Sequence, residues 1–208
     1  MRFIQKLVNE RFAKSTARLM EFVCYLGIGL LALCTVFSFI GRQTFILHTH
    51  AGRYERAIYA EEDHSSHSRG MTVHISDEIH VWTNDDDQVD GTSQLGLSLM
   101  YAVHTVPIML ALWFLSRVCS NIHGGQIFTE QNAFYLLYYG LIQFSVAVFV
   151  PFLKLLICWL TNLISDGGVS IATGQHMLDT VVPSIAFIVA AYIIRYGVHL
   201  QDEVDHTL

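Results

Sequence analysis

Histidine is the residue type in this chain whose number and spacing could do chemistry, because six of the eleven lie in one polar stretch. These six form a His-x-His pair, a His-x-x-His pair and two more among acidic residues; they are His48, His50, His64, His67, His74 and His80. Imidazole is a common ligand of zinc, copper and nickel, and it titrates near neutral pH. The stretch could therefore bind a metal ion or sense acid, although exposed histidines in a polar loop are more often only solvated.

A further histidine, His104, lies near the middle of an otherwise uncharged apolar run. Ionisable groups inside a membrane are frequently functional. The alternative is a neutral imidazole that hydrogen-bonds to a neighbouring helix, for which Tyr138 and Tyr139 are candidates. A transport path would need several such polar groups, and His104 is the main one. We find neither a nucleophile beside a base nor metal ligands clustered at one depth. We therefore expect a protein that is not an enzyme and has no cofactor.

The elements that position these residues are apolar segments long enough to cross a membrane. Ala133–Leu153 contains 21 residues without a formal charge, about 31 Å of helix, which matches the hydrocarbon thickness of a bilayer. The chain is 52% hydrophobic and 14% charged, against about 25% charged in soluble domains. We predict an all-α integral membrane protein, a four-transmembrane-helix bundle in one domain over 1–208, with spans at about 20–40, 95–116, 133–158 and 177–198.

A long polar connection joins the first two spans. Residues 41–94 carry four arginines and ten acidic residues, so this segment alone has a net charge of −6. Apolar and polar residues alternate over Thr72–Thr83, which predicts a small β-hairpin. The four cysteines all lie in or beside apolar runs, so nothing indicates a disulfide framework.

The basic residues predict the orientation. Arg2, Lys6, Arg11, Lys14 and Arg18 precede the first span, and such residues accumulate on the cytoplasmic side. We expect a multi-pass protein of the bacterial inner (plasma) membrane with both termini inside. Residues 41–94 then lie outside, and the N-terminus, the 117–132 loop and the 199–208 tail lie in the cytoplasm.

Two stretches on that inner side carry a resemblance. The sequence GQIFTEQN at 125–132 resembles the G-x-x-F-T-x-x-N entry to the third span of bacterial membrane proteins catalogued as domain of unknown function 2975. The sequence of 194–208 resembles that family's closing pattern of a glycine, a leucine, a glutamate and a terminal D-L-T-V. Here His206 and Leu208 replace the usual leucine and valine, and the outer loop is longer than in compact members.

The resemblance implies no particular reaction, because the family has no established chemistry. Members are often encoded beside a small helix-turn-helix regulator of the Cro/CI type, which implies a regulatory membrane partner for a transcription factor and no direct contact with nucleic acid. The candidate partner-binding residues are Gly125, Phe128, Thr129, Asn132, Gly197, Leu200, Glu203, Asp205 and Thr207. Thr129 could equally be only a helix N-cap. The alternatives are a small transporter or channel, and a metal- or pH-sensing protein acting through the outer loop.

Overall fold

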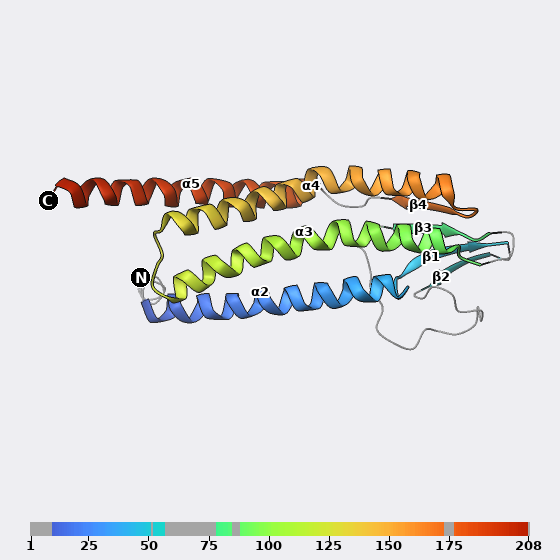
Figure 1. The fold of residues 1–208 in the computed structure, drawn as a ribbon, viewed down its shortest axis with the longest axis horizontal. Helices are drawn as coiled ribbons and strands as arrows, with labels where there is room; N and C mark the ends of the chain where they lie inside the picture. The colour runs from blue at the N-terminus through green and yellow to red at the C-terminus, as the bar shows by residue number, and fades with distance from the viewer. Residues whose placement is uncertain (1–9, 51, 57–77, 85–87, 173–176, 208) are drawn as a thin grey trace. The chain divides into compact units, whose positions relative to one another are not determined.

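The computed structural model describes residues 10–50, 52–56, 78–84, 88–172 and 177–207. Its elements are four helices and four short strands (Figure 1). In chain order they are α2 (Glu10–Phe39), β1 (Phe45–Thr49), β2 (Gly52–Arg56), β3 (Glu78–Trp82), α3 (Gly91–His123), α4 (Glu130–Ile164), β4 (Gly168–Ala172) and α5 (Met177–Thr207).

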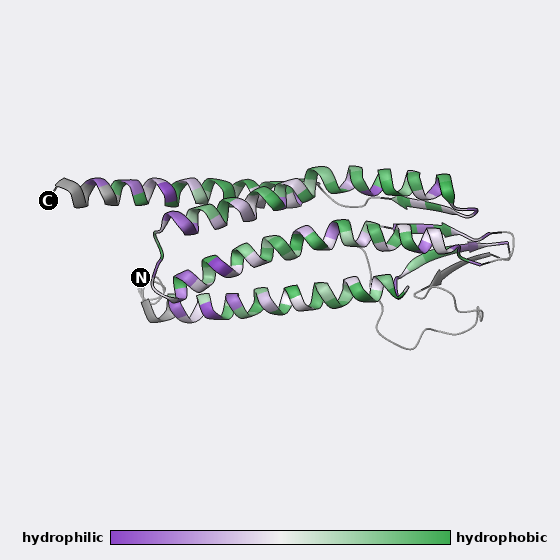
Figure 2. Ribbon diagram, in the orientation of Figure 1, coloured by the Kyte–Doolittle hydropathy of each residue, from purple (hydrophilic) through white to green (hydrophobic). Residues whose placement is uncertain are grey.

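The four helices are each long and apolar enough to cross a membrane. The qualifying segments are Ala13–Phe39, Gly91–His123, Glu130–Ile164 and Leu178–Leu200. Each expected span coincides with one of these helices. Large apolar side chains such as Phe22, Phe152 and Val182 lie exposed on them, as side chains that face lipid would. In Figure 2 hydrophobic residues dominate the helices, and hydrophilic residues gather near the α3–α4 connection and along the last part of α5.

The helices are longer than the apolar runs that predicted them. The expected loop 117–132 shrinks to residues 124–129, because α3 continues to His123 and α4 begins at Glu130. The expected tail 199–208 is the last part of α5, which continues to Thr207. The helices extend past the apolar runs because hydropathy marks only the apolar part of a helix, whereas backbone hydrogen bonds continue through polar residues.

The four strands form one sheet with the order β2-β1-β3-β4. Strands β1, β2 and β3 lie in the connection between α2 and α3, and β4 lies in the connection between α4 and α5. Strand β1 pairs antiparallel with β2 and parallel with β3, and β3 pairs antiparallel with β4. The connection between the first two spans does contain a hairpin, but it is β1–β2. Strand β3 corresponds to the second arm of the hairpin expected at 72–83, and Thr72–Ser76 lies outside the described residues. We did not predict β4, because its partner is some 90 residues away in sequence.

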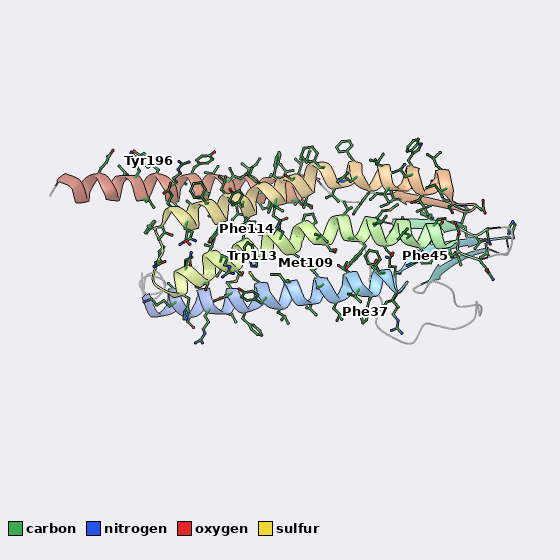
Figure 3. The ribbon with its side chains drawn as sticks, in the orientation of Figure 1. Phe37, Phe45, Met109, Trp113, Phe114 and Tyr196 are labelled. Atoms are coloured by element: carbon green, nitrogen blue, oxygen red, sulfur yellow. The ribbon has the colours of Figure 1, made fainter. Side chains whose placement is uncertain are left out.

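By contacts the chain divides into two compact units. The first comprises residues 1–30, 107–147 and 178–208, and the second comprises 31–106 and 148–177. In the second unit one face of the sheet is buried: Phe45, Leu47, Ile79, Val81 and Val169 pack with Leu97 and Met100 of α3. Phe37, near the end of α2, packs against this core; Figure 3 labels Phe37 and the core residue Phe45.

Candidate partner-binding site

The connection between α3 and α4 is closed by backbone hydrogen bonds. The amide of Gln126 donates to the carbonyl of Asn121 at 2.9 Å, and that of Gly125 donates to the carbonyl of Ile122 at 3.0 Å. This pair of bonds is the Schellman arrangement that ends many helices, and it requires a left-handed residue at the position of Gly125. Gly125 has φ of 88°, a backbone conformation that glycine adopts without strain, and this explains a glycine at this position.

Asn132 fixes the same connection from the α4 side. Its side chain is fully buried. The amide nitrogen donates to the carbonyls of Gln126 and Ile127, at 2.6 and 3.0 Å, and Oδ1 accepts from Asn121. The backbone amide of Asn132 donates to Oγ1 of Thr129 at 3.2 Å. Thr129 is therefore the N-cap of α4, which confirms that expectation.

This fixed connection carries two exposed apolar side chains. Phe128 is 61% exposed and Ile127 is 42% exposed. A Cβ atom built on Gly197 of α5 would lie 3.9 Å from Cδ1 of Phe128. Two of the residues predicted from separate motifs, Phe128 and Gly197, thus lie next to each other in the first unit.

Helices α4 and α5 approach closely behind this point. A Cβ atom on Gly140 would lie 2.8 Å from Cγ1 of Ile188 and 3.1 Å from the carbonyl oxygen of Ser184. Small residues allow helix backbones this near to one another. Nearby, the buried side chains Val118, Leu136 and Ala191 join α3, α4 and α5 in one apolar cluster. On the α3 side, Trp113 and Phe114 lie edge to face at 5.0 Å (Figure 3).

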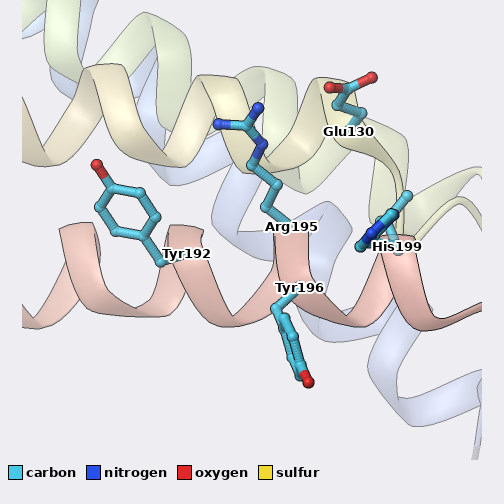
Figure 4. Close-up of a pocket in the computed structure, with 6 residues that line it drawn as sticks. Glu130, Tyr192, Arg195, Tyr196 and His199 are labelled. Atoms are coloured by element: carbon cyan, nitrogen blue, oxygen red, sulfur yellow. The ribbon is translucent and has the colours of Figure 1, made fainter.

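A pocket of about 510 Å³ opens beside Glu130 at the start of α4 and along residues 192–199 of α5. Its lining residues are Glu130, Tyr192, Arg195, Tyr196, Val198 and His199. Arg195 extends from α5 toward α4, where its Cζ lies 5.7 Å from the ring centre of Phe134, whereas Tyr196 points to the other side of α5 (Figure 4). The pocket offers a guanidinium, a carboxylate and aromatic surface, which suits a side chain that is partly apolar and partly polar.

None of the predicted partner-binding residues is among those that line this pocket, although they belong to neighbouring positions of the same elements. Gly125, Phe128, Thr129 and Asn132 belong to the α3–α4 connection and the first turn of α4. Gly197, Leu200 and Glu203 are in α5, and Nε2 of His199 lies 3.4 Å from Oε1 of Glu203. Asp205 and Thr207 lie in the same helix. The sequence analysis missed the pocket residues Arg195, His199 and Glu130, although a spacing of four between Arg195 and His199 places both on one helix face.

The remaining candidates lie in the second unit or outside the described residues. His104 is half-buried in α3. His48 and His80 lie together on the sheet, and His50 is exposed just after β1. His64, His67 and His74 lie outside the described residues.

Comparison with known proteins identifies one family. The family described as "Protein of unknown function (DUF2975)" matches residues 55–208, which is most of the chain. No curated protein and no solved structure matches the chain.

Proposed function

The chain belongs to the DUF2975 family of proteins of unknown function, and we propose that it is a non-enzymatic regulatory protein of the bacterial inner membrane. In this proposal both termini are cytoplasmic, and the surface around Phe128 and the α5 pocket binds a small helix-turn-helix regulator of the Cro/CI type. The observation that carries the proposal is Phe128, an exposed aromatic side chain on a connection whose own hydrogen bonds leave it little freedom.

A connection whose backbone is already fixed favours binding. It loses little backbone conformational entropy when a partner covers the side chains that it presents. Phenylalanine and tyrosine are enriched at the centres of protein interfaces, and Phe128 lies beside a pocket lined by Tyr192 and Tyr196. Arg195 and Glu130 supply charges of both signs at the same place, which would fix the orientation of the partner.

The end of α5 supports a basic partner. The apolar part of α5 ends at Leu200, and the helix continues to Thr207. The sequence QDEVDHTL at 201–208 contains three acidic residues and neither lysine nor arginine. DNA-binding domains carry a basic surface, so an acidic helix end would attract one, and DNA would compete with the membrane protein for it.

The test asks whether a helix-turn-helix regulator co-purifies with the protein and binds it again when both are pure. The tagged full-length protein is purified from native membranes, co-eluting proteins are identified by mass spectrometry, and the binding of the purified regulator is measured with and without its operator DNA. We expect a helix-turn-helix protein that binds the wild type and is displaced by DNA. The variant Phe128→Asp should weaken this binding by about tenfold or more.

The matched comparison uses alanine at two equally exposed phenylalanines, Phe128 and Phe152, the second of which is in the part of α4 that belongs to the second unit. Phe128→Ala should weaken regulator binding, and Phe152→Ala should bind the regulator as the wild type does. The proposal fails if no DNA-binding protein is enriched from native membranes, or if Phe128→Ala and Phe152→Ala bind the regulator equally well.

A further inference from the structure

The pocket at the start of α4 continues into a narrow crevice between α4 and α5. The crevice is lined by Ala133, Phe134 and Leu137 of α4 and by Ala191, Tyr192 and Arg195 of α5. Tyr192 and Arg195 also line the pocket, so the two hollows are adjacent. The pocket lies toward the polar end of α5, and the crevice lies toward the apolar middle of both helices. We call the two together the groove, and all of its residues belong to the first unit.

The lining of the crevice suits an apolar chain. Ala133 and Ala191 are buried, whereas Phe134 and Tyr192 are exposed beside them. Small side chains between two aromatic ones leave a shallow channel along the helices. Apart from Arg195, no lining residue of the crevice carries a charge. Such a channel gives the first carbon atoms of a hydrocarbon chain close contacts with aromatic and aliphatic side chains.

The position of the groove along the helices is that of lipid head groups in a bilayer. The membrane-compatible segment of α5 ends at Leu200, so residues 192–199 are its last ones, and α4 begins at Glu130. Tyrosine is enriched where a bilayer changes from hydrocarbon to head groups, and Tyr192 and Tyr196 are both exposed there. The pocket therefore meets head groups, and the crevice meets acyl chains.

The pocket offers charges of both signs. Arg195 presents a guanidinium, which binds the oxygens of a phosphate in pairs, and Glu130 presents a carboxylate to the same pocket (Figure 4). A carboxylate accepts hydrogen bonds from a primary ammonium and repels a purely anionic head group. The complementary ligand is therefore a zwitterion that carries a phosphate and a primary ammonium.

We propose that the groove binds one phospholipid of this type, phosphatidylethanolamine, with its phosphate on Arg195, its ammonium beside Glu130 and an acyl chain along the crevice. Basic pockets between spanning helices bind lipid head groups in this way. Lipid binding itself does not require a regulator. The bound head group occupies the pocket that the proposed function assigns to the regulator, so the lipid should weaken regulator binding; this last step alone rests on the proposed function.

The test is native mass spectrometry of the full-length protein in detergent, with added lipids of equal chain length. Phosphatidylcholine has the same phosphate but a quaternary ammonium without N–H donors, and phosphatidylglycerol has no ammonium. We expect one phosphatidylethanolamine to bind about tenfold more tightly than either, as the loss of a hydrogen bond between charged groups implies. Glycerophosphoethanolamine, the head group without acyl chains, should not displace the lipid at equal concentration.

Two substitutions separate the two charges. Arg195→Gln should weaken the binding of phosphatidylethanolamine by about tenfold or more. Glu130→Gln should give phosphatidylethanolamine and phosphatidylcholine nearly equal affinity. The matched control is Arg117→Gln, because Arg117 is another arginine of the first unit whose Cζ lies over an aromatic ring, that of Trp113 at 5.2 Å. Arg117 does not line the groove, so this variant should bind the lipids as the wild type does.

Three outcomes would overturn the proposal: equal binding of the three lipids to the wild type, equal loss of lipid in Arg195→Gln and Arg117→Gln, or displacement by glycerophosphoethanolamine at equal concentration. Because the lipid is measured without a regulator, these outcomes are independent of whether a regulator exists. Competition is then measured in lipid nanodiscs with and without phosphatidylethanolamine. Equal regulator affinity in both would refute the competition and leave lipid binding unchanged.

Discussion

The side-chain amide of Asn121, near the end of α3, donates a hydrogen bond of 2.7 Å to Oδ1 of Asn132, in the first turn of α4. The side-chain nitrogen of Asn132 at the same time donates hydrogen bonds to the carbonyls of Gln126 and Ile127. One buried side chain therefore joins the end of one helix, the connection and the start of the next. Only an amide has the acceptor and the two donor hydrogens that this arrangement uses.

Replacement of Asn132 by alanine should destabilise the protein. The substitution removes three hydrogen bonds made by a buried side chain, each worth about 0.5–1.5 kcal/mol. We expect a lower midpoint of thermal unfolding for the full-length protein in detergent. Gln131→Ala is the control, because the exposed Gln131 side chain donates to the hydroxyl of Tyr135 at the surface. Equal midpoints for the two variants would contradict the role assigned to Asn132.

Removal of the helix cap at Thr129 should destabilise the protein less than removal of the Asn132 side chain, and only near the start of α4. Thr129→Ala removes the acceptor of the Asn132 amide and should cost about 1 kcal/mol, whereas Thr129→Ser should restore most of it. Hydrogen exchange of the amides at 130–133 measures this directly. Exchange should be faster in the alanine variant and close to wild type in the serine variant. Indistinguishable rates in all three proteins would show that Thr129 does not cap α4.

The sequence predicted the helices well because lipid imposes a simple rule. A spanning segment must be predominantly apolar over about 20 residues, so Ala133–Leu153 could be recognised without any knowledge of its neighbours. Thr129 was predicted as an N-cap for a similar reason, since a cap depends on a few adjacent residues. Features that depend only on adjacent residues can be predicted from a single sequence.

The sheet and the pocket could not be predicted in this way. Val169 of β4 pairs with Val81 of β3, a contact across almost 90 residues that no local pattern specifies. The choice of His80 as the partner of His48, among six loop histidines, likewise depends on the parallel register of β1 and β3. Arg195 and Glu130 share a pocket only because α4 and α5 pack together, and their sequence separation conceals this.

Asp90 should make stability depend on pH. The hydroxyl of Thr92 donates to its carboxylate, and this bond, helped by Ser165 and the amides of Thr92 and Gly91, lowers the Asp90 pKa below its ordinary value. A lowered pKa stabilises the folded state above the unfolded-state pKa of about 3.9, and this contribution is lost as the pH falls through the folded-state value.

The measurement for Asp90 is the thermal midpoint of the wild type and of Asp90→Asn between pH 2.5 and 7. The wild type should be the more stable at neutral pH, and the difference should shrink as the pH falls below about 4. In a Thr92→Val background the pKa of Asp90 should lie nearer its ordinary value, so the same loss should occur at higher pH. A difference between wild type and Asp90→Asn that is independent of pH would refute the assignment.

The close approach of α4 and α5 predicts opposite effects of one substitution at two glycines. At Gly140 an added methyl group would meet Cγ1 and the backbone nitrogen of Ile188 and the carbonyl oxygen of Ser184, at 2.8 to 3.1 Å. Two of these three atoms are backbone, so the helices must separate, at a cost of about 1–3 kcal/mol. At Gly29, in α2, the same methyl group meets nothing within 4 Å. Gly29→Ala should therefore raise stability by about 0.5–1 kcal/mol, because alanine is the better helix former.

Thermal unfolding of the two variants distinguishes a packed α4–α5 pair from two helices that merely lie in the same bilayer. Gly140→Ala should lower the midpoint and Gly29→Ala should raise it. The proposed binding surface depends on the same packing, since the pocket takes Glu130 from α4 and Arg195 from α5. Gly140→Ala should therefore also weaken regulator binding, although it lies outside the pocket. A rise in midpoint for both variants would mean that α4 and α5 do not pack at Gly140.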